Sequence, residues 1–362
     1  MYWDTMTPFD LLFVLTALPS GYNAFVHLFY SLVKCKIKIT SDYHETILII
    51  LINSERSLRQ EDTLKVIQLE NRGAKERKTM FPSIYPFVKW AGGKTQLLQQ
   101  LYALVPTQFD RYFEPFLGGG AFFFYLISMR CNQFISYLSD INSDLINSYA
   151  VVKNNTEKLI GLLKKHETRY QESPSEYYYQ LRDINRPRNN VEKAARFIAL
   201  NRTCYNGLYR VNSKGSFNVP WGKYKDPLIC DSKNLRNLSI ALQQSKAIIQ
   251  LGDYKEILLN NAKEGDFIYL DPPYKPISST AYFTGYTEAG FTDKDQRDLA
   301  TIFEELNERK CRVMLSNSNT PLIKEMYSKL AKDIKKVNAI RAISCMGAGR
   351  AGHKELIIRN YS

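Results

Sequence analysis

The sequence predicts an α/β protein with a doubly wound, mostly parallel sheet, and three observations support this fold class. Short apolar runs recur along the chain after residue 111, each run ends in glycine or an acidic residue, and amphipathic stretches such as Lys294–Glu308 lie between them. Continuous apolar runs of this length are typical of parallel strands that are covered on both faces by helices. Ligands of such sheets bind beyond the carboxyl ends of the strands, so the polar residue after each run is a candidate site residue.

The expected strands, in chain order, are Tyr112–Phe116, Phe134–Leu138, Ile248–Leu251, Phe267–Leu270 and Val313–Leu315. The residues that follow them are Gly118 to Gly120, Asp140, Gly252-Asp253, Asp271 and Ser316-Asn317. We therefore expect these polar and glycine positions to meet at one edge of the sheet.

Residues 151–245 interrupt this alternation. The stretch is basic, rich in tyrosine and helical in pattern, and its segment Asn201–Lys225 is rich in Gly, Asn and Ser. We predict an inserted, mainly helical domain there, within an α/β domain formed by residues 80–150 and 246–362.

The first 79 residues differ from the rest. The stretch Leu11–Val33 contains no Asp, Glu, Lys or Arg and is long enough for a membrane span, but Pro19-Ser20-Gly21 interrupts it. Met80 would open a self-sufficient chain directly before the first strong motif. We therefore favour an N-terminal extension, or upstream sequence translated from a misplaced start codon, over a membrane anchor.

Charge and cysteine content indicate the partner and the compartment. The net charge is +13, and residues 80–362 carry 39 Lys and Arg against 27 Asp and Glu, a balance that favours a nucleic acid. The six cysteines and four histidines are scattered, with no C-x-x-C pair. We expect no metal site and no disulfide framework, and a reducing cytoplasm.

The segment from Glu114 to Phe122 contains three glycines, Gly118 to Gly120, between an expected strand and an expected helix. Glycine lets the backbone approach a ligand closely, and Asp140, 20 residues after Gly120, could accept hydrogen bonds from two ribose hydroxyls. The pattern favours a nucleoside-containing cofactor, although a plain glycine turn fits the three glycines alone.

The segment Lys89–Thr95 ends in Gly-Lys-Thr, as a phosphate loop does. A phosphate loop requires glycine five residues before Gly93, and that residue is Val88. What remains is Trp90, which can stack on a base or simply fill the core, and Lys94, which can contact a carboxylate or phosphate.

Asp271-Pro272-Pro273-Tyr274 follows the expected strand Phe267–Leu270. The two prolines stiffen the chain and remove backbone donors, which leaves the Asp271 carboxylate and the Pro272 carbonyl as acceptors beside the Tyr274 ring. Such a set suits a planar amine, whose two N–H groups it can bind while the ring stacks on the base. A rigid turn without chemistry is the alternative.

Taken together, these motifs resemble the Dam-type DNA adenine-N6 methyltransferases, from about Phe87 to Leu356. The match includes Lys89–Lys94, Glu114–Phe122, Asp140-Ile141-Asn142, Gly252-Asp253, Asp271–Tyr274, the loop Ser279–Thr284 and the tail from Arg341 to Leu356. The resemblance implies the fold of S-adenosylmethionine-dependent methyltransferases, S-adenosyl-L-methionine as the cofactor, and a catalytic motif formed by Asp271, Pro272, Pro273 and Tyr274. The cofactor site it implies comprises Trp90, Lys94, Glu114, Gly118, Gly120, Asp140, Asp253 and Asp271.

The segments Asn201–Arg210 and Gly215–Gly222 resemble the DNA-reading hairpin of family members that methylate GATC. Arginine can pair with the two major-groove acceptors of guanine, which suits Arg210, and apolar side chains can contact the thymine methyl. The DNA contacts expected on this basis are Lys89, Tyr205, Asn206, Leu208, Arg210 and Pro220. A basic hairpin that only holds phosphates is the alternative.

The sequence therefore predicts a site-specific DNA methyltransferase that acts on a flipped adenine in double-stranded DNA, within GATC, and that is monomeric in solution. Methylation of RNA or of a protein glutamine uses similar planar amines, and a catalytically silent DNA-binding module is a third interpretation. The complete Asp271–Tyr274 motif argues against a silent module. A partner of a restriction enzyme and a solitary regulatory enzyme fit the sequence equally well.

Overall fold

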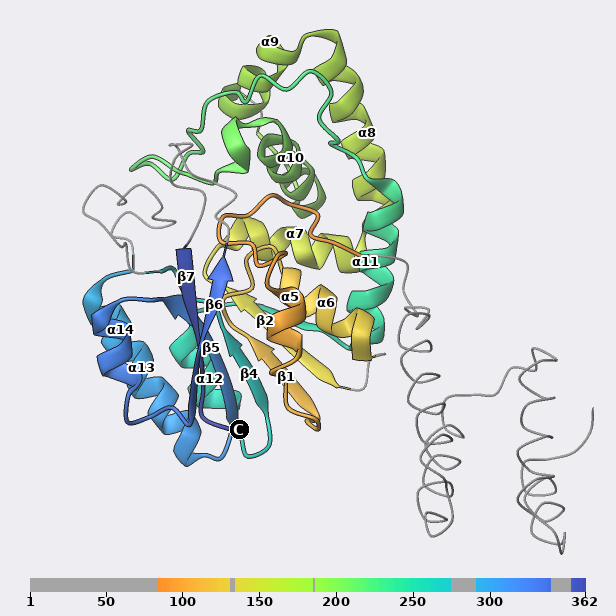
Figure 1. Ribbon diagram of the computed structural model, residues 1–362. Helices are drawn as coiled ribbons and strands as arrows, with labels where there is room; N and C mark the ends of the chain where they lie inside the picture. Colours follow the sequence, from red (N-terminus) through yellow and green to blue (C-terminus); the bar gives the residue numbers. More distant parts are fainter. Residues whose placement is uncertain (1–83, 131–133, 185, 275–290, 340–352) are drawn as a thin grey trace, which may run out of the picture. The chain divides into compact units, whose positions relative to one another are not determined.

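The computed structural model of the chain describes residues 84–130, 134–184, 186–274, 291–339 and 353–362, which all belong to one compact unit, Thr79–Ser362 (Figure 1). The interpretations of residues 1–79, of Met80, of the loop Ser279–Thr284 and of most of the tail after Arg341 lie outside the described residues.

The described unit alternates strands and helices. In chain order the elements are α5 (Leu98–Tyr102), β1 (Arg111–Glu114), α6 (Ala121–Arg130), β2 (Ile135–Asp140), α7 (Ser143–Asn154), α8 (Thr156–Glu172), α9 (Pro174–Tyr179), the π-helix η1 (Gln180–Ile184), α10 (Asn190–Thr203), the 3-10 turn η2 (Tyr205–Gly207), α11 (Ser232–Gln244), β3 (Ile248–Leu251), α12 (Tyr254–Asn261), β4 (Phe267–Leu270), α13 (Asp293–Glu308), β5 (Arg312–Ser318), α14 (Pro321–Tyr327), β6 (Asp333–Ala339) and β7 (His353–Arg359).

The strands form one sheet in the order β3-β2-β1-β4-β5-β7-β6. The first five in this order pair in parallel, whereas β7 is antiparallel to both β5 and β6. The chain moves outward from β1 in one direction to β3, then returns to β4 on the other side of β1. The carboxyl ends of β1 and β4 therefore flank the position where the winding direction reverses, which is the usual ligand crevice of such sheets.

The core residues of each strand alternate between two apolar layers. On β4, Phe267 and Tyr269 join the cluster that contains α6 and α7, whereas Ile268 and Leu270 join the cluster that contains α12, α13 and α14. Figure 1 shows α13 and α14 on one side of the sheet and α6 and α11 on the other. The predicted doubly wound, mostly parallel α/β fold is confirmed.

The helices α8 to α11 fall within the predicted insertion 151–245. Their buried residues belong to the same apolar cluster as those of α6 and α7, and α10 packs against both α7 and α8. Because this segment shares its core with one face of the sheet domain, the boundaries of an inserted domain stay a prediction. None of the helices in the described ranges is long and apolar enough to cross a membrane.

Candidate active site

The predicted site residues of β1, β2 and β4 meet at the carboxyl edge of the sheet. Glu114 and Asp140 are the last residues of β1 and β2, and Asp271 directly follows β4. Since β1 pairs in parallel with both β2 and β4, these three carboxyl groups lie at the same edge, beside the crevice.

Lys94, Asp271 and Tyr274 form a compact cluster. The Lys94 ammonium lies 2.9 Å from Asp271 Oδ1 and donates a hydrogen bond to the Gly92 carbonyl at 3.0 Å. The same nitrogen lies 4.5 Å from the centre of the Tyr274 ring. The Lys94 side chain is only 7% exposed, so a fixed positive charge stands next to the Asp-Pro-Pro-Tyr turn.

The Asp271 carboxylate keeps unused acceptor capacity. Its Oδ1 is buried beside the Lys94 ammonium, and a carboxylate oxygen can accept more than one hydrogen bond. Burial raises the pKa of Asp271, and the nearby Lys94 ammonium opposes that rise. The acceptor sites that Lys94 does not use are suited to binding a donor group of a ligand.

A buried amide relay holds the Asp-Pro-Pro-Tyr turn from its other side. Gln296 Nε2 on α13 donates to the Pro273 carbonyl at 3.1 Å, and Asn317 Nδ2 on β5 donates to Gln296 Oε1 at 2.9 Å. Both side chains are fully buried. The direction of the peptide that leads to Tyr274 is thus set by two separate elements.

The glycine turn between β1 and α6 is shaped by backbone conformation that side chains rarely adopt. Gly118 has φ of 49°, and a Cβ there would lie 2.7 Å from Trp90 Cδ1. The Gly118 N–H donates to Asp140 Oδ2 at 3.0 Å, and the Asn142 N–H donates to Asp140 Oδ1 at 2.9 Å. Trp90, the turn and Asp140 therefore form one contiguous wall, and only glycine fits at residue 118.

The two remaining acidic residues differ in their surroundings. Glu114 is buried and accepts a hydrogen bond from the Tyr112 hydroxyl at 2.6 Å, and burial raises its pKa to about 8. Asp253 instead caps α12, where its carboxylate accepts the Lys255 N–H at 2.8 Å. Burial thus favours the neutral form of Glu114, whereas Asp253 has a structural partner in the helix that follows it.

The segment Cys204–Trp221 folds into a hairpin. Its arms are joined by antiparallel bridges between Cys204 and Trp221 and between Val211 and Phe217. Arg210 is exposed, and its guanidinium donates to the side-chain and backbone oxygens of Asn218 at 2.7 and 3.1 Å. The Arg210 side chain is thus held in place at the surface of the hairpin.

Apart from Lys89, the other residues predicted to contact DNA lie on the same hairpin. Tyr205 and Pro220 are exposed, and Asn206 and Leu208 are half-buried. Asn206 has φ of 53°, a left-handed conformation that asparagine tolerates better than most residues. The structure therefore brings this set together on one hairpin.

Asn201 connects the hairpin to the segment that carries Lys89, a role that the sequence interpretation missed. Its side chain accepts the Lys89 N–H at 2.7 Å and donates to the carbonyls of Lys89 at 2.8 Å and Gly207 at 3.0 Å. The signal in the sequence is a polar residue directly after Ile198, Ala199 and Leu200 near the end of an apolar helix. Lys89 also places its ammonium 4.2 Å from the centre of the Tyr224 ring.

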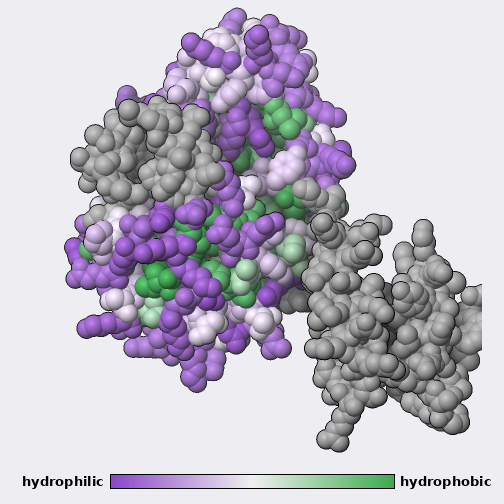
Figure 2. Space-filling view, in the orientation of Figure 1, coloured by the Kyte–Doolittle hydropathy of each residue, from purple (hydrophilic) through white to green (hydrophobic). Residues whose placement is uncertain are grey.

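The surface of the helical part is mainly hydrophilic in the view of Figure 2. Its exposed basic residues between α8 and Lys225 are Lys158, Lys164, Lys165, Arg169, Arg186, Arg188, Lys193, Arg210, Lys214, Lys223 and Lys225. Such a surface suits a polyanion.

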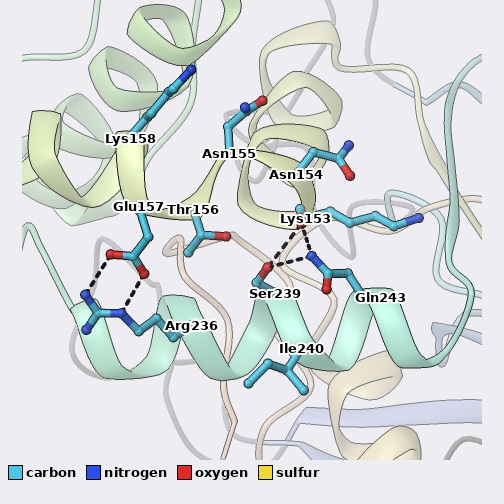
Figure 3. A pocket seen from close by; sticks show the side chains of 10 residues that line it. All are labelled: Lys153, Asn154, Asn155, Thr156, Glu157, Lys158, Arg236, Ser239, Ile240 and Gln243. Atoms are coloured by element: carbon cyan, nitrogen blue, oxygen red, sulfur yellow. Dashed lines mark hydrogen bonds and ion pairs between the residues drawn. The ribbon is translucent and has the colours of Figure 1, made fainter.

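A separate open cavity of about 510 Å³ lies where α7, α8 and α11 meet, and it shares no residue with the cluster around Asp271 (Figure 3). Its polar groups are largely satisfied by one another, because Arg236 makes two hydrogen bonds to Glu157, and Ser239 and Gln243 both donate to the Lys153 carbonyl. We see a helix junction there, not a second site.

The sheet order, the glycine turn backed by Asp140, and the Asp-Pro-Pro-Tyr turn at the crevice together define an α/β methyltransferase. Residues 90–343 match the D12 class of N6 adenine-specific DNA methyltransferases, and the chain belongs to this family. It is an adenine-specific DNA methyltransferase, and its substrate is DNA.

Curated relatives agree with this assignment. The chain is 44% identical over 293 residues to the type II methyltransferase M.MjaIII of Methanocaldococcus jannaschii, covering 77% of this chain and 99% of that protein. It is 41% identical over 284 residues to the type II methyltransferase M1.LlaDCHI of Lactococcus lactis subsp. cremoris, covering 77% and 96%. It is 36% identical over 275 residues to the DNA adenine methylase of Escherichia coli strain K12, covering 75% and 93%.

Among solved structures, an rRNA methyltransferase from Streptomyces viridochromogenes is 11% identical, with coverage of 77% of this chain and 86% of that one. The TM-score of 0.35 is too low for this likeness to define the fold.

Methyltransferases of this family and fold use S-adenosyl-L-methionine in general, and the residues present fit such a donor. Gly118 lets the turn pack directly against Trp90, Asp140 stands at the end of β2, and the Asp271 carboxylate follows β4 at the same edge of the sheet. No cluster of His, Cys, Asp and Glu side chains that could hold a metal ion occurs in the described ranges.

Proposed function

We propose that this enzyme transfers a methyl group from S-adenosyl-L-methionine to the N6 amine of an adenine flipped out of duplex DNA, within the sequence GATC. The observation that carries the proposal is the placement of Asp271 and Tyr274 at the crevice with Lys94 fixed between them. Enzymes that modify a base inside a duplex extrude it into a pocket, where stacking and hydrogen bonds hold it.

The target amine has two N–H groups, and the turn offers two acceptors for them, the Asp271 carboxylate and the Pro272 carbonyl. Lys94 lies over one face of the Tyr274 ring, so the adenine stacks on the opposite face. Accepting both N–H bonds directs the nitrogen lone pair away from the turn, toward the methyl donor. The amine must lose one proton when its new N–C bond forms, and Asp271 is placed to receive it.

Bound S-adenosyl-L-methionine supplies a methyl group made electrophilic by the positive sulfonium. The residues that would hold it are Trp90, Lys94, Glu114, Gly118, Gly120, Asp140, Asp253 and Asp271. Asp140 accepts backbone N–H groups that include those of Gly118 and Asn142, and a carboxylate has about four acceptor sites, so capacity remains for a ribose hydroxyl. Asp253 would act through its backbone or through the carboxylate oxygen that does not cap α12.

We assign the reading of GATC to the hairpin. Arg210 uses two of its five N–H donors on Asn218, so three remain for the two major-groove acceptors of a guanine. Leu208 and Pro220 would contact the thymine methyl, Tyr205 and Asn206 would contact bases or phosphates, and Lys89 would reach the outer guanine. The resemblance of this hairpin to that of GATC-specific members supports the sequence assignment.

The test is digestion of DNA from a methylation-deficient host that expresses the full chain. A nuclease that cuts only methylated GATC should cut this DNA, and a nuclease that cuts only unmethylated GATC should leave it intact. The matched control is a host that expresses Asp271→Ala, whose DNA should show the opposite pattern. Adenine methylation that leaves GATC sites unmodified would contradict the assigned site but not the enzyme class.

A further inference from the structure

Glu355 lies on β7, where it pairs with Ser318 of β5 and Val337 of β6. Its side chain is only 10% exposed, although it carries a carboxylate. Burying a charge is costly unless it has partners, so the groups around Glu355 indicate its role.

Within the described ranges, the Glu355 side chain contacts two polar groups of the cluster described above. Its Oε2 accepts the Tyr274 hydroxyl hydrogen at 2.9 Å and lies 3.9 Å from the Lys94 ammonium. Tyr274 is 81 positions away in the chain, so only the fold brings the two together.

We propose that Glu355 is a positioning residue for methyl transfer, which anchors the hydroxyl end of Tyr274 and draws the Lys94 ammonium over the ring. This inference rests on the proposed function, because it assumes that the target base stacks on Tyr274.

A tyrosine ring fixed only at its backbone end can rotate about two side-chain bonds. The Glu355 carboxylate fixes the opposite end, and a hydrogen bond to a charged acceptor is stronger than one to a neutral acceptor. The relay from Gln296 to the Pro273 carbonyl holds the backbone of the same turn. The ring is thus constrained at both ends, which presents one defined face to the base.

The Glu355 carboxylate also gives Lys94 a second anchor. It lies 2.9 Å from Asp271 Oδ1 and 3.9 Å from Glu355 Oε2, so the two carboxylates share one cation. With both anchors in place, the ammonium covers one face of Tyr274, and that face is closed to the base.

The test compares Glu355→Gln, which keeps an acceptor oxygen of the same shape, with Glu355→Leu, which removes it. Tyr274→Phe and the double variant Tyr274→Phe/Glu355→Leu complete a double-mutant cycle with Glu355→Leu and wild type. Glu304→Gln, the same change at an exposed acid of α13, is the matched control. Three quantities are measured on the full chain: single-turnover methyl transfer to duplex DNA, the dissociation constants for S-adenosyl-L-methionine and DNA, and the fluorescence of 2-aminopurine placed at the target adenine.

Loss of positioning should slow transfer in Glu355→Leu by about 10- to 100-fold while both dissociation constants stay within about threefold of wild type. Glu355→Gln should lose less, since it retains the hydrogen-bond acceptor. In the Tyr274→Phe background, where the hydroxyl is gone, the same Leu substitution should cost less than about threefold, because interacting residues are not additive. The 2-aminopurine should emit more strongly in Glu355→Leu than in wild type, since a loosely held ring stacks less on the base.

Multiplicative losses in the double variant, or a Glu355→Leu enzyme that behaves like Glu304→Gln, would overturn the positioning role. If neither wild type nor Glu355→Leu, in which the ring stacks less on the base, brightens 2-aminopurine on binding although both transfer methyl groups, base flipping in the proposed function is refuted instead, and the stacking argument with it.

Discussion

The substitution Asn201→Ala should separate the hairpin from the Lys89 segment. The Asn201 side chain is 2% exposed and serves three backbone groups, the N–H and carbonyl of Lys89 and the carbonyl of Gly207. Alanine offers none of these hydrogen bonds. The Gly207 carbonyl then lies buried without this partner, and the two Lys89 groups gain only partial access to water.

A buried polar group without a partner costs about 1–3 kcal/mol, so one buried group and two half-buried groups should lower the free energy of unfolding by about 3 kcal/mol. For a domain of this size each kcal/mol shifts Tm by about 2–4 °C, which gives an expected loss of roughly 6–12 °C. The hairpin and Lys89 also lose their common support, so the affinity for a GATC duplex should fall together with the discrimination against altered sites.

The assay is thermal unfolding followed by titration with GATC duplexes at a temperature where both proteins are folded. The matched control is Asn147→Ala, which removes one exposed hydrogen bond to the Asn190 carbonyl and should change stability by less than about 0.5 kcal/mol. If Asn201→Ala unfolds at the wild-type temperature and discriminates between sites as wild type does, the bridge has no energetic role and our reasoning about the hairpin fails.

Four further outcomes are expected. Asp271→Ala should abolish methyl transfer yet bind GATC duplexes with wild-type affinity, which filter binding alongside a labelled-donor assay would check; near-normal transfer would contradict the acceptor role. Asp140→Ala should weaken S-adenosyl-L-methionine binding in calorimetry with the fold intact, and unchanged affinity would reduce Asp140 to support of the glycine turn. Arg210→Ala should cost about 1–3 kcal/mol on GATC but much less on sites altered at the guanine it reads, whereas an equal loss on all sequences, with a salt slope lower by about one, would indicate a phosphate contact. Burial raises the pKa of Glu114 in the folded protein to about 8, above its value in the unfolded chain. The stability that the neutral Glu114 provides is therefore fully present below the pKa of the unfolded chain, and it is lost as the pH rises through the pKa of the folded protein. The Tm difference between Glu114→Gln and wild type should therefore increase in favour of the variant from about pH 5 to about pH 9, and a constant difference would show that Glu114 does not titrate in this range.

The central strands were predictable because burial on both faces makes them continuous apolar runs. The predicted bounds Phe267–Leu270 are those of β4, which is buried at all of its residues. The predicted bounds Ile248–Leu251 are those of β3, an apolar edge strand that is partly exposed. The antiparallel pair β6 and β7 was not predicted. β6 lies at the sheet edge and contains Lys335 and Lys336, so its sequence does not resemble a buried strand. An edge strand is held by its pairing with a distant segment, which local patterns do not reveal.

The site residues likewise include some that local patterns reveal and some that only the fold brings into place. Asp271 and Tyr274 were predictable because one rigid turn carries both, and Lys94 because its glycine turn has a recognisable pattern. Glu355 and Asn201 act on residues 81 and 112 positions away, so their roles depend on the packing of the whole sheet and of α10. The apolar residues before Asn201 mark it as a polar residue in a buried stretch, but no local pattern identifies the distant partners of either side chain.

The central claim is that this chain methylates adenine N6 within GATC. The most direct measurement is sequence-resolved detection of N6-methyladenine in a methylation-free plasmid after incubation with the purified full chain and S-adenosyl-L-methionine. We expect N6-methyladenine at the adenines of GATC on both strands and unmodified adenines elsewhere. N6-methyladenine at a different sequence, with GATC sites unmodified, would contradict it.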